Sequence, residues 1–166
     1  MATNAMIAAD LDDVIMWKIA DTLAATSFYG PPLFSVVKVF GSREEAEEHV
    51  FTAASVCAVV YVTTDTFNIP DLEVGCLLHL LVMVATKGDE ATLRSRNLTK
   101  RLNAVRNALN TNIPSNANGF GEGGDGEYHP RIRIDTPERD ENAEDPWAIA
   151  WMPVDIAYRT TTRITH

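Results

Sequence analysis

The longest hydrophobic run of the chain covers residues 74–86 and is broken only by His79. Successive side chains of a strand point to opposite faces, so the even-numbered residues of this run would form one face and the odd-numbered residues the other. Both faces are apolar except at His79, which is typical of a central strand covered on both sides. The run is too short for a transmembrane helix, which needs about 20 apolar residues. Periodicity alone leaves a buried helix open, but Gly75 and the valines favour a strand.

Three helices are expected where hydrophobic residues recur at helical spacing. The first covers residues 7–26. The second is short and starts with a capping box, in which the side chains of Ser42 and Glu45 would bind free backbone amides. Its narrow apolar stripe consists of Ala46, Val50, Phe51 and Ala54. The third helix covers residues 90–109, and Asp89 is expected to cap it.

Strands are expected in the runs that are rich in β-branched and aromatic residues. They cover residues 33–40, 56–62, 74–86, 128–135 and 147–162. Residues 63–72 are expected to be a connection. In the last strand the apolar positions change phase at Met152, and a bulge would shift the alternation by one residue and tolerate a proline. We therefore predict a β-bulge near Met152 and Pro153.

Two further segments are expected to be flexible loops, namely the Gly- and Asn-rich residues 110–127 and the acidic residues 136–146. The resulting element order is α-β-α-β-β-α-β-β. It predicts a single α+β domain over residues 1–166. An antiparallel or mixed β-sheet of about five strands would have two or three helices packed mainly on one face.

The composition changes this picture mainly through its charge. Hydrophobic residues make up 46% of the 166 residues, and 23 acidic residues against 14 basic ones give a net charge of −9. This balance argues against a nucleic-acid-binding surface, which needs clustered lysine and arginine. Cys57 and Cys76 lie in apolar runs and are expected to be buried thiols. The first ten residues lack the basic region of a signal peptide, so we expect a protein of a reducing cytoplasm.

No enzyme motif emerges from the sequence. The Gly-rich residues 119–126 neither follow a strand nor open a helix, and their acidic side chains would repel phosphate. The four histidines, His49, His79, His129 and His166, lack metal-ligand spacing. His79 is expected to be a core or interface histidine, with a catalytic base as the alternative. No catalytic, metal or cofactor site is predicted.

The third helix is the most basic element of the chain. It carries Arg94, Arg96, Lys100, Arg101 and Arg106. A basic helix face is usually either solvated or in contact with acidic neighbours, and no aromatic platform for nucleic-acid bases accompanies this charge. We expect these arginines to face acidic neighbours.

The layout as a whole resembles a known family. An amphipathic helix leads into the strand of residues 34–40, and a short helix, the strand of residues 56–62 and the long central strand follow. A helix over residues 97–109 and a closing strand with the sequence Asp-Ile-Ala-Tyr-Arg-Thr-Thr at residues 155–161 complete the chain. This order resembles the tail terminator (tail completion) proteins of long-tailed bacteriophages and the neck proteins of the same fold. The resemblance rests on element order and the closing strand and brings no catalytic residues.

The resemblance implies a structural virion protein, assembled in the host cytoplasm. It would form a ring, typically a hexamer, that ends polymerisation of the tail tube and joins the tail to the head connector. DNA would pass through the ring without specific binding, which suits the negative charge. The alternatives are a small enzyme or ligand-binding domain with a pocket near His79, and a monomeric adaptor domain. The candidate interface residues are His79, Met83, Arg94, Arg96, Arg101, Arg106, Glu138, Arg139, Asp140, Glu141, Trp147 and Trp151.

Overall fold

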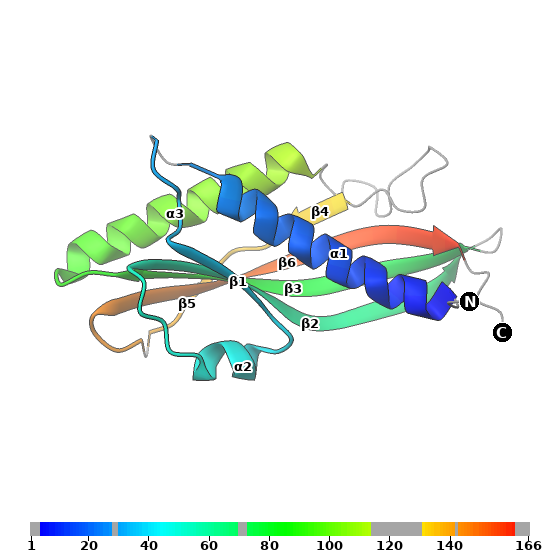
Figure 1. Cartoon of the computed structure of the whole chain (residues 1–166), viewed down its shortest axis with the longest axis horizontal. Helices are drawn as coiled ribbons and strands as arrows, with labels where there is room; N and C mark the ends of the chain where they lie inside the picture. Colours follow the sequence, from blue (N-terminus) through cyan, green and yellow to red (C-terminus); the bar gives the residue numbers. More distant parts are fainter. Residues whose placement is uncertain (1–3, 28–29, 70–72, 114–130, 142, 162–166) are drawn as a thin grey trace.

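The computed structural model describes residues 4–27, 30–69, 73–113, 131–141 and 143–161. Three helices and a six-stranded mixed sheet make up this part of the chain (Figure 1). The helices are α1 (Asn4–Ala25), α2 (Arg43–Glu48) and α3 (Ala91–Asn112). The strands are β1 (Val36–Phe40), β2 (Ser55–Ile69), β3 (Glu73–Lys87), β4 (Arg131–Ile134), β5 (Glu138–Arg139) and β6 (Trp147–Thr161). The predicted α+β class and mixed sheet are confirmed, and the element order differs only by the short β5.

The sheet is built around three long strands. The strand order is β1-β2-β3-β6-β4, and β5 also pairs with β6. β1 runs parallel to β2, whereas all other pairs are antiparallel. β2, β3 and β6 have 15 residues each, but β1 has 5 and β4 has 4. The short outer strands therefore cover only part of each edge of the three central strands.

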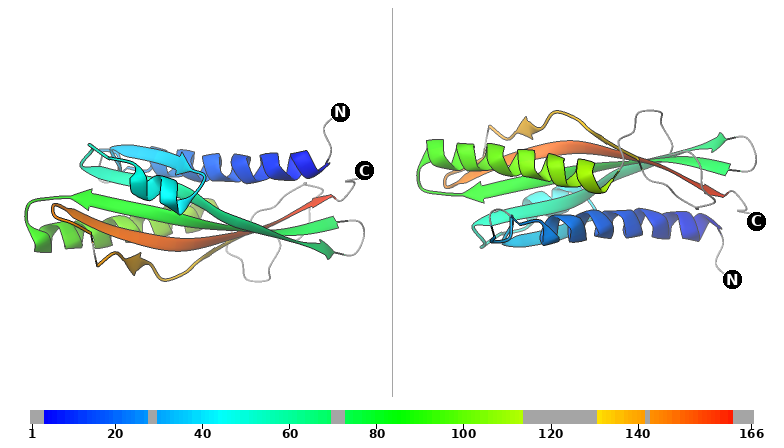
Figure 2. Two further views of the ribbon diagram at one scale, coloured as in Figure 1. Left: turned by 90° about the horizontal axis from the view of Figure 1, so that it is seen from below. Right: turned by 90° about the horizontal axis from the view of Figure 1, so that it is seen from above.

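The two long helices lie on one face of the sheet and α2 lies on the other, as the two views of Figure 2 show. The even-numbered side chains of β3, from Val74 to Val84, pack in the core beneath α1 and α3. A smaller cluster, which includes Met83 and Trp151, lies on the face of α2. The prediction that helices pack mainly on one face is confirmed.

The expected connection over residues 63–72 is wrong. β2 continues to Ile69, and its residues from Thr63 onward pair with β3. The register of this pair shifts between Tyr61 and Thr63, which leaves Val62 as an extra residue in β2. No described element covers one face of this half of β2, which accounts for its polar residues and for their resemblance to a loop sequence.

The β-bulge expected near Met152 and Pro153 is also wrong for the pairing of β6 with the central strand. The register between β3 and β6 is unbroken along all 15 residues of each strand. The apolar residues change face instead. Trp147, Ile149 and Trp151 pack on the side of α2, whereas the even-numbered residues from Met152 to Tyr158 pack beneath α1 and α3.

The predicted cap of the short helix is confirmed, but the helix is shorter than expected. The Glu45 amide donates to Ser42 Oγ at 3.1 Å, and a Glu45 carboxylate oxygen accepts from the Gly41 amide at 3.2 Å. The helix ends at Glu48, because His49 is already extended with φ −73 and ψ 132. The stripe that was expected to reach Ala54 is therefore broken, and Val50 is 82% exposed.

Further differences concern α3 and the loops. Glu90, rather than Asp89, occupies the N-cap position of α3, and its side chain makes no capping hydrogen bond. The helix continues to Asn112, so residues 110–112 are helical, while residues 114–127 of the expected glycine-rich loop lie outside the described residues. The expected acidic loop of residues 136–146 contains β5, and residue 142 is not described.

Other expectations concern single residues. Cys57 and Cys76 are fully buried free thiols, as predicted. His129 and His166 lie outside the described residues, as do residues 128–130 of the expected fourth strand. Across the described ranges, no helix has the length and hydrophobicity needed to cross a membrane. The same residues contain no group of three or more histidine, cysteine or acidic side chains that could hold a metal ion.

Candidate functional site

The first candidate site is the half of the sheet face that α2 leaves uncovered. α2 lies over one half of this face, and the ends of β2, β3 and β6 extend beyond it (Figure 2). The odd-numbered residues of β3 point to this side, and Leu77 and His79 are only partly buried there. At His79 the second face of the central strand is only partly covered by the described residues, as expected. This does not hold at Met83, which is 3% exposed in the cluster on the α2 side.

Four charged side chains form a chain of contacts across this open half, which we call the His79 network (Asp65, His79, Asp155 and Arg133). His79 Nδ1 lies 2.6 Å from an Asp155 oxygen, and His79 Nε2 lies 2.9 Å from an Asp65 oxygen. Arg133 donates to the second Asp155 oxygen at 3.0 Å. The register creates this network, because His79 and Arg133 both pair with Asp155 on neighbouring strands.

The His79 network favours the protonated form of the imidazole. Partial burial lowers the pKa of His79, but the hydrogen bonds and the negative charges of Asp65 and Asp155 outweigh this effect and raise it above its ordinary value. Both ring nitrogens then act as donors to carboxylates. These contacts favour the doubly protonated imidazole over the neutral form that a general base requires, so the geometry gives no support to the alternative of His79 as a general base.

The second feature of this region is an open strand edge. β1 pairs with residues 56–60 of β2, and no described strand pairs with the outer edge of β2 beyond that point. Two large hydrophobic side chains are exposed on this segment, Val62 at 50% and Phe67 at 44%. The open edge, residues 62–68, starts at the bulge and stops one residue before the end of β2 at Ile69. An unpaired edge of this length presents a row of free backbone donors and acceptors.

On the opposite face, α1 is fixed to the same strands by a polar contact. The hydroxyl of the fully buried Tyr158 donates to Asp12, and Thr64 Oγ1 donates to the other Asp12 oxygen at 2.8 Å. Burial raises the pKa of Asp12, and the hydrogen bonds from Tyr158 and Thr64 partly oppose this. The contact holds α1 over the extended half of the sheet and leaves the other face free.

The basic residues of α3 mostly find partners within the chain, and not on an open surface. Arg94 pairs with Asp145 and donates to the Gly88 carbonyl at 2.9 Å. The side chain of Arg101 donates to the Leu33 carbonyl at 3.1 Å, and burial lowers the pKa of its guanidinium. Arg94 thus meets an acidic neighbour of its own chain.

Of the remaining predicted interface arginines, two bind groups of their own chain and one is exposed to solvent. Arg106 contacts the Asp135 carbonyl at 3.4 Å. Arg139 of β5 donates to Ser95 and Thr99 of α3 and so ties the two elements together. Arg96 is exposed and makes no hydrogen bond or ion pair with any residue that the structure describes. Lys100 is likewise exposed, so Arg96 and Lys100 are the basic residues of α3 that a partner could reach most easily.

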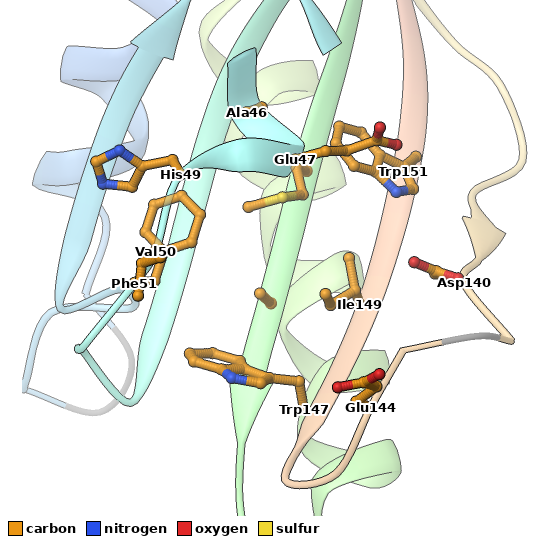
Figure 3. Close-up of a pocket in the computed structure, with 12 residues that line it drawn as sticks. Ala46, Glu47, His49, Val50, Phe51, Asp140, Glu144, Trp147, Ile149 and Trp151 are labelled. Atoms are coloured by element: carbon orange, nitrogen blue, oxygen red, sulfur yellow. The ribbon is translucent and has the colours of Figure 1, made fainter. Parts of the chain in front are cut away.

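The third feature is a pocket of about 590 Å³ between α2, the segment that follows it, and the start of β6 (Figure 3). We call it the aromatic pocket. Its lining residues are Ala46, Glu47, His49, Val50, Phe51, Met83, Ala85, Asp140, Glu144, Trp147, Ile149 and Trp151. It brings together four of the predicted interface residues, Met83, Asp140, Trp147 and Trp151. Glu138 and Glu141 are exposed and line a neighbouring hollow, together with Arg43, Arg139, Asp140 and Trp151.

Sequence reasoning found His79 but missed its partners and the open edge. Asp155 is a single acid within an apolar strand, and this was the available signal. The sequence pattern predicts a loop at Asp65, so it does not predict the position of Asp65 beside His79. The pattern predicts Phe51 on the stripe of the short helix and Glu144 in an acidic loop, but not their proximity, which depends on the end of α2 and the path of the segment before β6. No family model matches this chain, and no curated protein matches its sequence.

Proposed function

We propose that this chain is a structural ring subunit at the head-proximal end of the tail of a long-tailed bacteriophage. It would act as a tail terminator or as a neck protein of the same fold. The observation that carries this proposal is the open edge, residues 62–68, beside the uncovered half of the sheet. It supports a subunit that is complete only in an assembly, as the resemblance in element order also implies.

The open edge has few of the features that protect long edges in monomeric proteins. Natural monomers protect long edges with prolines, charges or a covering element. Here a bulge at Val62 marks the end of the pairing with β1, and Asp65 is the one charged residue among residues 62–68. The exposed Val62 and Phe67 add apolar surface to the same segment. A strand from a neighbouring subunit would satisfy the backbone groups and cover these side chains.

The distribution of charge supports the proposed passage of DNA. The net charge is −9, and Arg94, Arg101, Arg106 and Arg139 bind groups of their own chain. A ring of such subunits attracts the phosphate backbone weakly, because phosphate affinity requires accessible basic groups. Its partners would be further copies of itself, the tail tube protein and the neck or connector protein.

The test is the oligomeric state of the purified chain by size-exclusion chromatography with light scattering, followed by negative-stain imaging. We expect rings for the wild type and monomers for the double variant Val62→Lys with Phe67→Lys, since lysine on an edge opposes strand pairing. The matched control is Val14→Lys with Leu93→Lys, which changes two exposed apolar residues on α1 and α3. This control should keep the ring.

Two results would contradict the proposal. One is a wild-type chain that stays monomeric at high concentration with no ring in the images, which would favour the adaptor alternative. The other is a ring that survives in the Val62 and Phe67 double variant. Circular dichroism of both double variants would show whether the monomer remains folded.

A further inference from the structure

The aromatic pocket has the chemistry of a site for an organic cation. Figure 3 shows Trp147 and Phe51 on two sides of it, with Asp140 and Glu144 at its edge. The lining includes three carboxylate side chains and neither lysine nor arginine among the described residues. Glu47 pairs with Arg43 at 2.9 Å, whereas Glu144 is exposed and forms no ion pair within the described part of the chain. The lining therefore has acidic side chains, but no lysine or arginine, next to aromatic surface.

Two of the indole rings already attract cations of the chain itself. The guanidinium carbon of Arg43 lies 4.4 Å from the centre of the Trp151 ring, and Lys87 Nζ lies 5.9 Å from the centre of the Trp147 ring. Both distances fall within the usual range for attraction between a cation and an aromatic face. Neither Arg43 nor Lys87 lines the pocket. A cation inside it would find the same kind of aromatic surface, together with the carboxylates of Asp140 and Glu144.

An unpaired donor in the wall of the pocket points to a second feature of the ligand. Trp151 is 4% exposed, and its Nε1–H group has no acceptor among the residues that the structure describes. Figure 3 shows this nitrogen on the edge of the indole that faces Ile149 and Asp140. A buried donor without an acceptor is costly. A ligand that fits this site would therefore bring a neutral acceptor, such as a carbonyl oxygen, besides its positive charge.

We propose that the aromatic pocket binds a basic residue, arginine or lysine, in a peptide segment of a partner protein. The cationic group lies against Trp147 and between Asp140 and Glu144, and a peptide carbonyl accepts from Trp151 Nε1. A peptide unit joins these two groups in one residue, which a free metal ion or a simple ammonium ion cannot do. The volume of about 590 Å³ is within the range of sites that enclose a ligand of this size.

The probe is a short capped peptide with one arginine flanked by glycines, compared with the same peptide that carries citrulline. Citrulline keeps the shape and the carbonyl groups but removes the charge. The readout is the set of indole N–H signals in proton–nitrogen correlation spectra, assigned with Trp17→Phe and Trp147→Phe. We expect the arginine peptide to shift the Trp147 and Trp151 signals and leave the signal of the exposed Trp17 in place. The arginine peptide should also bind about fivefold more tightly than the citrulline peptide.

A pair of matched variants locates the charge preference. Asp140→Asn with Glu144→Gln should reduce the preference for arginine to less than about twofold. Glu138→Gln with Glu141→Gln removes the same charge from exposed residues that do not line the pocket, and it should leave the preference intact. Ethylguanidinium, which lacks a carbonyl group, should shift the Trp147 signal but not the Trp151 signal.

Three results would overturn the proposal. They are equal affinity for the arginine and citrulline peptides, unchanged Trp147 and Trp151 signals at millimolar peptide, and an equal loss of preference in both double variants. These measurements do not depend on ring formation, so their failure is separate from a failure of the proposed structural role.

Discussion

At the scale of single residues, the His79 network makes stability depend on pH. Because the pKa of His79 is raised in the folded state, its contribution is complete below the unfolded value of 6.5 and is lost as the pH rises through the folded value. Between about pH 6 and about pH 9 we expect the free energy of unfolding of the wild type to fall by about 1 kcal/mol from this source. His79→Gln should lack this decrease. The measurement is urea unfolding across the pH range.

Asp135→Asn provides the control for the His79 network. Asp135 lies 3.7 Å from Arg133, and no hydrogen bond or ion pair to His79 is present in the described residues. The decrease in stability with pH should therefore persist in Asp135→Asn. A pH profile of His79→Gln that matches that of the wild type would show that the network does not hold the imidazole proton.

A second prediction at this scale concerns the contact between α1 and the sheet. Tyr158→Phe removes a donor from the partly buried Asp12, whose pKa is already raised by burial. We expect a loss of about 1–3 kcal/mol at neutral pH. The loss should be smaller near pH 4, because a protonated Asp12 carries no charge to be compensated. Urea unfolding at both pH values measures the difference.

Tyr61→Phe is the control for this contact. The Tyr61 hydroxyl lies 3.0 Å from Thr64 Oγ1, and Thr64 in turn donates to Asp12. Tyr61 therefore reaches Asp12 only through Thr64. The removal of the Tyr61 hydroxyl should cost less than the removal of the Tyr158 hydroxyl, and the cost should change little with pH. Equal losses in the two variants would show that the Asp12 charge does not determine the stability of this contact.

At the scale of elements, α2 depends on its cap more than the longer helices do. It has 6 residues, and Ser42 binds one of its free amides. Ser42→Ala should lower the free energy of unfolding by about 1 kcal/mol and speed hydrogen exchange in α2. Thr111→Ala, at an exposed position of α3, should change it by less than about 0.5 kcal/mol. Unchanged exchange in α2 after Ser42→Ala would contradict this role of the cap.

The strands show what the sequence could and could not predict. The alternation in residues 74–86 correctly separated the two faces of β3, because both faces are buried along much of their length. The second half of β2 was missed, because only one of its faces is covered and polar residues suffice on the other. From Met152 onward the apolar side chains of β6 lie on the opposite face of the sheet, although the register is unbroken. In the sequence, this change of face looks the same as a β-bulge.

The candidate site was harder to predict than the fold, because it depends on register. Asp155 meets His79 through the pairing of β3 with β6, which are separated by about half of the chain. Asp65 reaches His79 only because Val62 is an extra residue in β2. The position of neither acid follows from local propensity, so His79 alone could be named in advance.

At the scale of the whole molecule, the charge distribution predicts weak interaction with DNA. The net charge is −9, and most basic residues of α3 bind groups of their own chain. We expect no shift of duplex DNA in gel electrophoresis, even at low salt, where basic proteins bind most tightly. A shift that appears as the salt concentration is lowered would show an accessible basic surface and contradict the proposed lining of a DNA channel.

The pairing of β3 with β6 has a consequence for how the chain folds. β2 and β3 are adjacent in sequence and can pair early, but the other edge of β3 stays bare until residues 147–161 have been synthesised. Such distant pairing slows folding, because a long loop must close before the contacts form. During this time the centre of the sheet is exposed and open to aggregation. Chaperone dependence in the cell is therefore an expected property of the newly made chain.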